Sequence, residues 1–214
     1  DLFDDCLGRI ALMNRGFERA LLLGCPDAGW PDRLRPFADW VECRDPGPLF
    51  AAAAGGEPII EDAWGAVSQA YDLVLAVGTL ESVNDLPLAL RLIRHALRTD
   101  SLFIGAASGG DTLPRLRRAM RAADAAGGVA APHVHPRIEA SALAPLLGDA
   151  GFVRPVVDVE RVPVSYRTFD RLVSDLRAMA ATNVLRARGP PLTRAQRGAA
   201  SRAFAEAAED GRTT

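Results

Sequence analysis

Short apolar runs alternate along this chain with segments whose apolar residues recur at helical spacing. The clearest strand is predicted at Tyr71–Val77, which is apolar, β-branched at two positions and followed by Gly78. Shorter runs predict four further strands, at Arg19–Gly24, Trp40–Cys43, Leu102–Ala106 and Val156–Val164. Because strands and helices alternate, the pattern predicts an α/β fold with a mainly parallel sheet and helices on both faces.

Periodicity and capping residues predict the helices. Helical segments are expected from Leu86 to Leu97, from Pro114 to about Ala126, from Ser141 to Ala150, from Phe169 to Met179 and from Arg194 to about Glu209. Thr112 is a candidate N-cap for the second of these helices, and Gly151 closes the third. Thr193 and Gln196 have the spacing of a capping box at the start of the last helix.

Length and composition indicate one globular domain. The chain has 214 residues, of which 49% are hydrophobic and 24% charged, so it can bury a core. We expect a single domain over residues 1–214, with an N-terminal helical segment at 1–18, a sheet core at 19–164 and C-terminal helices at 165–214. The chain contains no Lys, which excludes covalent catalysis through a Lys amine.

Charge and cysteine content limit the partners and the location. A formal net charge of −2 gives no support for a nucleic-acid partner. No apolar run reaches the roughly 20 residues that a membrane-spanning helix needs. Cys6, Cys25 and Cys43 are an odd number without C-x-x-C spacing, so we expect no disulfide framework and a cytoplasmic location.

Several motifs resemble one family in both their order and their spacing. They are Val83–Pro87, Leu97–Phe103, Gly109–Leu113, Ala150–Phe152, Pro155–Asp158, Val164–Tyr166 and Asp175–Met179, and they fall within a match that runs from about Met13 to about Arg194. This pattern is similar to class I S-adenosylmethionine-dependent methyltransferases with a Rossmann-like sheet. Within them it resembles the group that contains the assembly factor five of mitochondrial complex I, its α-proteobacterial relatives and the methyltransferases of early biotin synthesis.

The resemblance implies a fold, a cofactor and two kinds of function. It implies a seven-stranded, mostly parallel sheet whose last strand follows the final helix. Since the chain stops at Asp210–Thr214, where that strand should begin, we expect the strand to be missing from it. It implies S-adenosylmethionine as cofactor and methyl transfer to an unknown small-molecule or protein acceptor. The alternative is a non-catalytic or divergent protein with an eroded cofactor loop, a possible pseudoenzyme that acts by binding a protein partner, as in assembly of complex I.

The loop after the first strand departs from the family pattern. The family has an Asp-Leu-Gly-Cys-Gly-Thr-Gly turn there, and this chain has Leu22–Gly29 in its place. Leu22 stands where the acidic residue usually lies, and Pro26 and Ala28 replace glycines. Pro26 has no N–H and a φ fixed near about −65°, so it can neither donate a hydrogen bond nor adopt a positive φ. Either the loop still binds the cofactor, or it is a plain strand-to-helix turn.

The remaining cofactor positions are better preserved. Asp45 matches the carboxylate that accepts the ribose hydroxyls, although an Asp before Pro is also a common turn former. Asp62 matches the acidic residue near the adenine amino group, and surface charge is its alternative interpretation. Glu81 and Ser82 replace the His-Trp pair of the family. The candidate cofactor contacts are Gly24, Cys25, Asp27, Gly29, Asp45, Asp62, Ala63, Gly78, Thr79 and Leu80.

No catalytic residue and no metal site is predicted. His133 and His135 form an H-x-H pair, but only Glu139 lies near them in the sequence as a third ligand. The arginines of the 115–121 segment suit an anionic partner or, more simply, a solvated helix face. Methyl transfer needs alignment of the reacting groups more than an acid or a base, so the lack of a catalytic motif does not exclude it.

Overall fold

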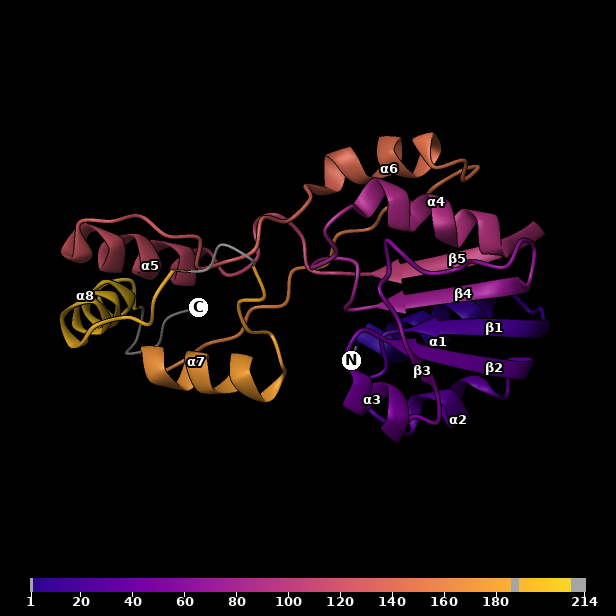
Figure 1. Ribbon diagram of the computed structural model, residues 1–214, viewed down its shortest axis with the longest axis horizontal. Coiled ribbons are helices and arrows are strands. Elements are labelled where there is room, and N and C mark those ends of the chain that lie inside the picture. The colour runs from indigo at the N-terminus through magenta and orange to yellow at the C-terminus, as the bar shows by residue number, and fades with distance from the viewer. Residues whose placement is uncertain (1, 186–188, 209–214) are drawn as a thin grey trace. The chain divides into compact units, whose positions relative to one another are not determined.

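The computed structural model describes residues 2–185 and 189–208 (Figure 1). Contacts divide the chain into two compact units, which are treated separately below. The sheet unit comprises Asp1–Gly109 and Ile138–Val157, and the helical unit comprises Gly110–Arg137 and Asp158–Thr214. No helix within the described residues is both long and apolar enough to cross a membrane.

The sheet unit contains five parallel strands in the order β3-β2-β1-β4-β5. The strands are β1 (Phe17–Leu23), β2 (Ala38–Asp45), β3 (Glu57–Pro58), β4 (Tyr71–Val77) and β5 (Leu97–Ala106). Leu22 in the central strand pairs with Cys43 of β2 and with Leu75 of β4. All arrowheads in Figure 1 point the same way, so the carboxyl ends of the strands lie along one edge of the sheet.

Apolar side chains on the two faces of β1 explain why helices cover both sides of the sheet. Leu22 belongs to a core cluster with Phe3 and Leu34, whereas Leu21 belongs to a second cluster with Ile93. The helices of this unit are α1 (Leu2–Leu12), α2 (Trp30–Leu34), α3 (Pro48–Ala53), α4 (Leu86–Ala96) and α6 (Ala140–Asp149). The predicted doubly covered parallel sheet is therefore confirmed.

The helical unit has its own apolar core. It contains α5 (Pro114–Gly127), α7 (Phe169–Ala178) and α8 (Arg194–Ala205). Phe169 and Phe204 meet edge to face with ring centroids 6.0 Å apart, and Leu116 and Leu172 are buried in the same cluster. Both hydrogen bonds of the predicted capping box at the start of α8 are present. The helix ends at Ala205, and Glu209, its predicted end, lies outside the described residues.

Three predictions about elements were wrong. Val156–Val164 forms no strand, because no strand among the described residues pairs with it, and Val156 and Val162 are 82% and 68% exposed. Leu97, expected in a helix, instead begins β5. The described sheet has five strands, and residues 209–214, where the last strand was expected to begin, are outside the described part. Thr112 does not cap α5, because Leu113 precedes Pro114 in a left-handed conformation with φ of 58°.

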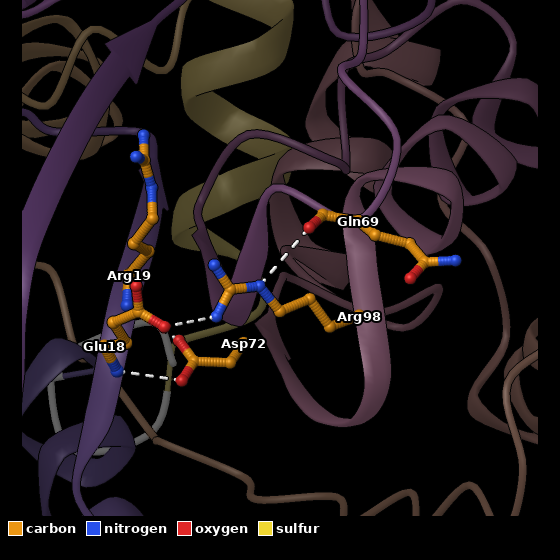
Figure 2. Close-up of polar contacts among 5 residues, drawn as sticks. All are labelled: Glu18, Arg19, Gln69, Asp72 and Arg98. Atoms are coloured by element: carbon orange, nitrogen blue, oxygen red, sulfur yellow. Dashed lines mark hydrogen bonds and ion pairs between the residues drawn. The ribbon is translucent and has the colours of Figure 1, made fainter.

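Polar side chains join the amino ends of β1, β4 and β5 (Figure 2). The Asp72 carboxylate accepts hydrogen bonds from the backbone N–H groups of Glu18 and Arg19, each at 2.8 Å. Arg98 forms an ion pair of 2.6 Å with Glu18 and donates through Nε to the carbonyl oxygen of Gln69 at 3.3 Å. We call these five residues the amino-end network. It ties strand starts that are far apart in the sequence.

Candidate functional site

The candidate site lies at the carboxyl ends of β1, β2 and β4, where Gly24 lies close against Val77 and Thr79. Gly24 has a φ of +83° and donates its N–H to the carbonyl oxygen of Arg44 at 2.9 Å. A Cβ at this position would lie 2.3 Å from Thr79 Cγ2 and 2.4 Å from the Val77 carbonyl oxygen. Only glycine fits there, and its immediate neighbours belong to the end of β4.

Asp45 joins the first loop to the end of β2. Its side chain is 5% exposed, its Oδ2 accepts the N–H of Cys25 at 2.6 Å, and its Oδ1 accepts the N–H of Gly47 at 2.6 Å. The turn-forming role considered for Asp45 from the sequence is therefore present, since the carboxylate holds the N–H of Gly47 two residues on. Each carboxylate oxygen can accept a second hydrogen bond, so two ribose hydroxyls remain acceptable partners.

The loop between β1 and α2 is held by its own side chains. Asp27 Oδ1 accepts the N–H of Gly29 at 2.8 Å, and the Asp27 carbonyl oxygen accepts the N–H of Trp30 at 3.1 Å. Pro26 and Ala28, which replace glycines of the family, are exposed. Leu22 is completely buried in the core beneath the loop, so it packs where the family has an acidic side chain.

The segment after β3 carries two acidic residues: Asp62, which the sequence predicted as a site residue, and Glu61, which it did not. Asp62 Oδ2 accepts the backbone N–H of Asp85 at 2.8 Å, and Asp85 in turn caps α4 through the N–H of Leu88 at 2.9 Å. Its neighbour Glu61 is only 8% exposed. Burial raises the pKa of the Glu61 carboxyl, and the negative charges of Asp62 and Asp45 raise it further. Glu61 adjoins Asp62 in the sequence, and no other signal distinguished it.

The loop after β4 carries a buried hydroxyl without a partner. Thr79 is 4% exposed, and its Oγ1 has no hydrogen-bond partner among the described residues. Gly78 donates its N–H to the Ala106 carbonyl oxygen at 2.8 Å, which fixes the start of this loop against β5. Leu80 is 9% exposed and lies in the cluster that contains Leu21. A buried hydroxyl without a partner is unfavourable and marks a place where a ligand or water can bind.

Glu81 and Ser82, the departures from the family pattern, hold this part of the site together. The Glu81 carboxylate accepts the N–H of Ser108 at 3.2 Å and its hydroxyl at 2.8 Å, which links the loops after β4 and β5. Ser82 Oγ donates to the Thr79 carbonyl oxygen at 3.2 Å. Glu81 and Ser82 therefore make hydrogen bonds within this loop and to the loop after β5.

The contacts connect some of the predicted site residues directly. Gly24 touches Thr79, and Cys25 is hydrogen-bonded to Asp45. Asp62 is tied to the start of α4, and Ala63 donates its N–H to the Ile60 carbonyl oxygen at 2.9 Å. Each Asp45 oxygen can accept one more hydrogen bond, and the Thr79 hydroxyl has no partner among the described residues. Both groups suit a ligand that carries hydroxyl donors and other polar groups. The residues present therefore fit a nucleoside cofactor such as S-adenosylmethionine.

Two other features do not form part of this site. A hollow of about 530 Å³ lies at the opposite edge of the sheet, lined by Gln69, Arg94 and other residues near the amino ends of β4 and β5. In the helical unit, His133 pairs with Asp124 at 2.7 Å, and His135 Nε2 accepts the N–H of Val184 at 3.1 Å. The two His residues thus have separate partners, and no group of metal-ligating residues occurs in the described part of the chain.

Comparison with known proteins adds sequence relatives from both groups that the motifs resemble. No family model matches the chain. The Danio rerio protein named "Arginine-hydroxylase NDUFAF5, mitochondrial" is 41% identical over 115 residues, which are 53% of this chain and 36% of that protein. The malonyl-(acyl-carrier protein) O-methyltransferase of Laribacter hongkongensis is 34% identical over 122 residues, 57% of this chain and 39% of that protein. The chain thus spans little more than a third of each of these two relatives.

Solved structures agree with the fold. The YcgJ protein of Bacillus subtilis has a TM-score of 0.58 at 12% identity, covering 82% of this chain and 76% of its own. The N-methyltransferase NodS of Bradyrhizobium japonicum, crystallised with S-adenosylhomocysteine, has a TM-score of 0.50 at 16% identity, covering 74% and 75%. The family resemblance stated from the sequence is confirmed by these relatives, and the solved structures show that the chain has the Rossmann-like class I methyltransferase fold.

Proposed function

We propose that this protein binds S-adenosylmethionine at the carboxyl ends of β1, β2 and β4 and transfers its methyl group to an acceptor. The observation that carries the proposal is the Asp45 carboxylate, which is held at the end of β2 by the N–H groups of Cys25 and Gly47. A buried carboxylate in this place, beside a glycine turn, is the arrangement that holds the ribose of nucleoside cofactors in doubly wound folds.

The roles of the other residues follow from their positions. Asp45 would accept the ribose hydroxyls, and Asp62 would accept the adenine amino group. Thr79 would use its partnerless hydroxyl on the polar end of the cofactor. The remaining proposed contacts are Gly24, Cys25, Asp27, Gly29, Ala63, Gly78 and Leu80. The cofactor, when bound, supplies an electrophilic methyl group on a sulfonium. The chain supplies binding, orientation and exclusion of water, which suffice for an in-line transfer.

A ligand titration tests the proposal. S-adenosylmethionine and S-adenosylhomocysteine are added to the full chain while its melting temperature and the heat of binding are measured. Ligand at 100 times its Kd should stabilise the folded protein by about 2.7 kcal/mol. The Arg98→Gln variant at the amino-end network should give the same shift, whereas Asp45→Ala should give none. No shift in the unaltered protein at millimolar ligand would contradict the proposal.

A second candidate function is a divergent assembly or binding protein that has the fold and lacks the cofactor. It is favoured by the same loop: Pro26 has no N–H, the space beside Gly24 is filled by Thr79 and Val77, and both Asp45 oxygens already accept backbone donors. The hydroxylase name of the first relative and the transferase name of the second leave both functions open. A protein that ignores both ligands and co-purifies with a defined partner would support this candidate.

The acceptor, a protein partner and a cytoplasmic location also belong to the proposal. The acceptor class is a small molecule or a protein, and only the second relative is named for a methyl acceptor. A protein partner is supported by a Haloferax volcanii structural neighbour with a TM-score of 0.52, a putative methyltransferase solved in complex with the Trm112 activator. A cytoplasmic location would be checked by fractionating the native host, since the animal relatives are named as mitochondrial.

A further inference from the structure

Two of the three thiols lie together beneath the proposed cofactor loop. Cys25 is 1% exposed and Cys43 is 5% exposed, both belong to the same apolar core cluster, and the interaction between the two thiols is the largest influence on the pKa of each. Cys43 pairs in register with Leu22, three residues before Cys25, and it precedes Asp45 by two residues on the same face of β2. The hydrogen bond from the Cys25 N–H to the Asp45 carboxylate ties the loop after β1 to the end of β2.

The third thiol provides an internal contrast. Cys6 is 3% exposed and belongs to the same apolar cluster, but it comes from α1. Its pKa is raised by burial first and then by the charge of Asp5, and neither other cysteine acts on it. The pKa of Cys25 is also raised, in this case first by the hydrogen bond with Cys43 and then by burial. Burial is therefore shared by all three thiols, and contact with a second thiol distinguishes Cys25 and Cys43.

The pair also lies where the chain can open. Pro26, Asp27 and Ala28 directly follow Cys25 and are exposed, whereas Cys43 lies inside a paired strand. Loops with few buried contacts open at a lower free-energy cost than core strands do. Opening of residues 25–28 would expose both sulfur atoms without breaking the pairing of β1 with β2.

We propose that Cys25 and Cys43 form an oxidative modification site at which a hydroperoxide converts the two thiols to an intrachain disulfide. One thiolate attacks the outer oxygen of the peroxide, which gives a sulfenic acid and releases water or an alcohol. The second thiol then attacks that sulfur, the S–S bond forms, and the sulfenic oxygen leaves as water. The peroxide is reduced by two electrons and the two thiols are oxidised by two, so each peroxide consumes one pair.

The disulfide regulates the site described above. An S–S bond is about 2.05 Å long, shorter than any contact between two unbonded thiols, so the two sulfur atoms must move closer together. Cys25 Sγ must also leave the Asp27 carbonyl oxygen, to which it donates at 3.3 Å. This displacement disturbs the loop that Asp27 organises. The loss of ligand binding on oxidation rests on the proposed function, whereas formation of the disulfide does not.

The test treats the full chain with one equivalent of hydrogen peroxide and measures intact mass and non-reduced peptides. We expect a product lighter by two hydrogen atoms, with the peptides of Cys25 and Cys43 linked, and the same product from Cys6→Ser. Cys25→Ser and Cys43→Ser should instead stop at a sulfenic acid, and Cys25→Ala and Cys43→Ala serve where a Ser variant does not fold. A link to Cys6, a link between chains, or no link in protein shown to be folded overturns the proposal.

A second measurement separates the modification from its effect. The oxidised protein should lose most of the rise in melting temperature that S-adenosylhomocysteine produces, and dithiothreitol should restore it. A disulfide that forms without altering that rise overturns the regulatory role. If the reduced protein shows no rise at all, the proposed function fails while the mass measurement still decides whether the modification site exists.

Discussion

At each of the two edges of the sheet, an aspartate accepts two backbone N–H groups, but the two aspartates have different surroundings. At the amino ends, Asp72 accepts the N–H groups of Glu18 and Arg19; at the carboxyl ends, Asp45 accepts those of Cys25 and Gly47. Asp72 is only half-buried, and its neighbours are long charged side chains. Asp45 is 5% exposed. The amino edge is therefore fixed by polar contacts that can adjust, whereas the carboxyl edge is fixed by close packing.

The glycines at the two ends of β1 show the same contrast. Gly16 precedes β1 and has no atom within 4 Å of the position where a Cβ would lie. Gly24 follows β1, has a positive φ, and faces Thr79 and Val77 at less than van der Waals distance. Identical residues thus meet different constraints, and the tight one lies at the edge that carries the proposed site. Packing, more than polar bonding, distinguishes the edge that carries the proposed site.

The largest expected effect comes from filling the space at Gly24. Gly24→Ala should destabilise the protein by about 3 kcal/mol, because a left-handed conformation and steric overlap both oppose the added methyl group. Gly16→Ala should be nearly neutral. Chemical denaturation of the two variants beside the unaltered protein measures the difference. Equal denaturation midpoints for the two variants would mean that Val77 and Thr79 move aside easily to admit the methyl group at position 24.

Removing the two carboxylates separates stability from binding. Asp45→Ala should cost about 2 kcal/mol, since two N–H groups lose their acceptor in a buried place, and should abolish binding of S-adenosylhomocysteine. Asp72→Ala should cost about 1 kcal/mol, because water can reach the freed N–H groups, and should leave binding intact. Calorimetric titration with parallel denaturation reports both quantities. Loss of binding in Asp72→Ala would remove the distinction between the edges.

Most of the sheet unit could be predicted from the sequence because its pattern is local. Tyr71–Val77 is an uninterrupted apolar run and forms β4 with the predicted bounds. Leu97 was assigned to a helix by its spacing, yet it begins β5, since the apolar stripe of α4 continues in phase past the end of that helix. Val156–Val164 alternates like a strand, but a strand also requires a partner, which the described residues do not provide. Pairing partners are not encoded in a local pattern.

The sequence identified candidate residues that lie at the carboxyl ends of the strands, but it did not reveal most of their contacts. Asp45 and Gly24 were found through the family motif, and the structure joins them to Cys25 and Thr79. The second backbone bond to Asp45, the burial of Glu61 and the lone hydroxyl of Thr79 arise from three-dimensional packing, so no spacing in the sequence reveals them. The roles of the ten candidate residues in cofactor binding stay predictions.

A smaller effect is expected at Glu61, and it depends on pH. Burial raises the pKa of this carboxyl above its unfolded value, so its contribution to stability is fully present below the unfolded pKa and is lost as the pH rises through the folded pKa. Glu61→Gln removes the buried charge. Its melting temperature should therefore exceed that of the unaltered protein at pH 8, and the difference should shrink toward pH 4. Asp62→Asn, at the half-buried neighbour, serves as the control.

The smallest effect is expected at the ion pair of the amino-end network. Arg98 and Glu18 are 33% and 64% exposed in their side chains, so water and salt screen their attraction. The hydrogen bond to Glu18 raises the pKa of Arg98, and desolvation lowers it by less. Arg98→Gln should shift the melting temperature slightly at low salt and not measurably at high salt. A large, salt-independent loss of melting temperature would mean that the hydrogen bond from Arg98 Nε to the Gln69 carbonyl oxygen holds the amino edge together. The amino edge would then tolerate substitution as poorly as the carboxyl edge does at Gly24.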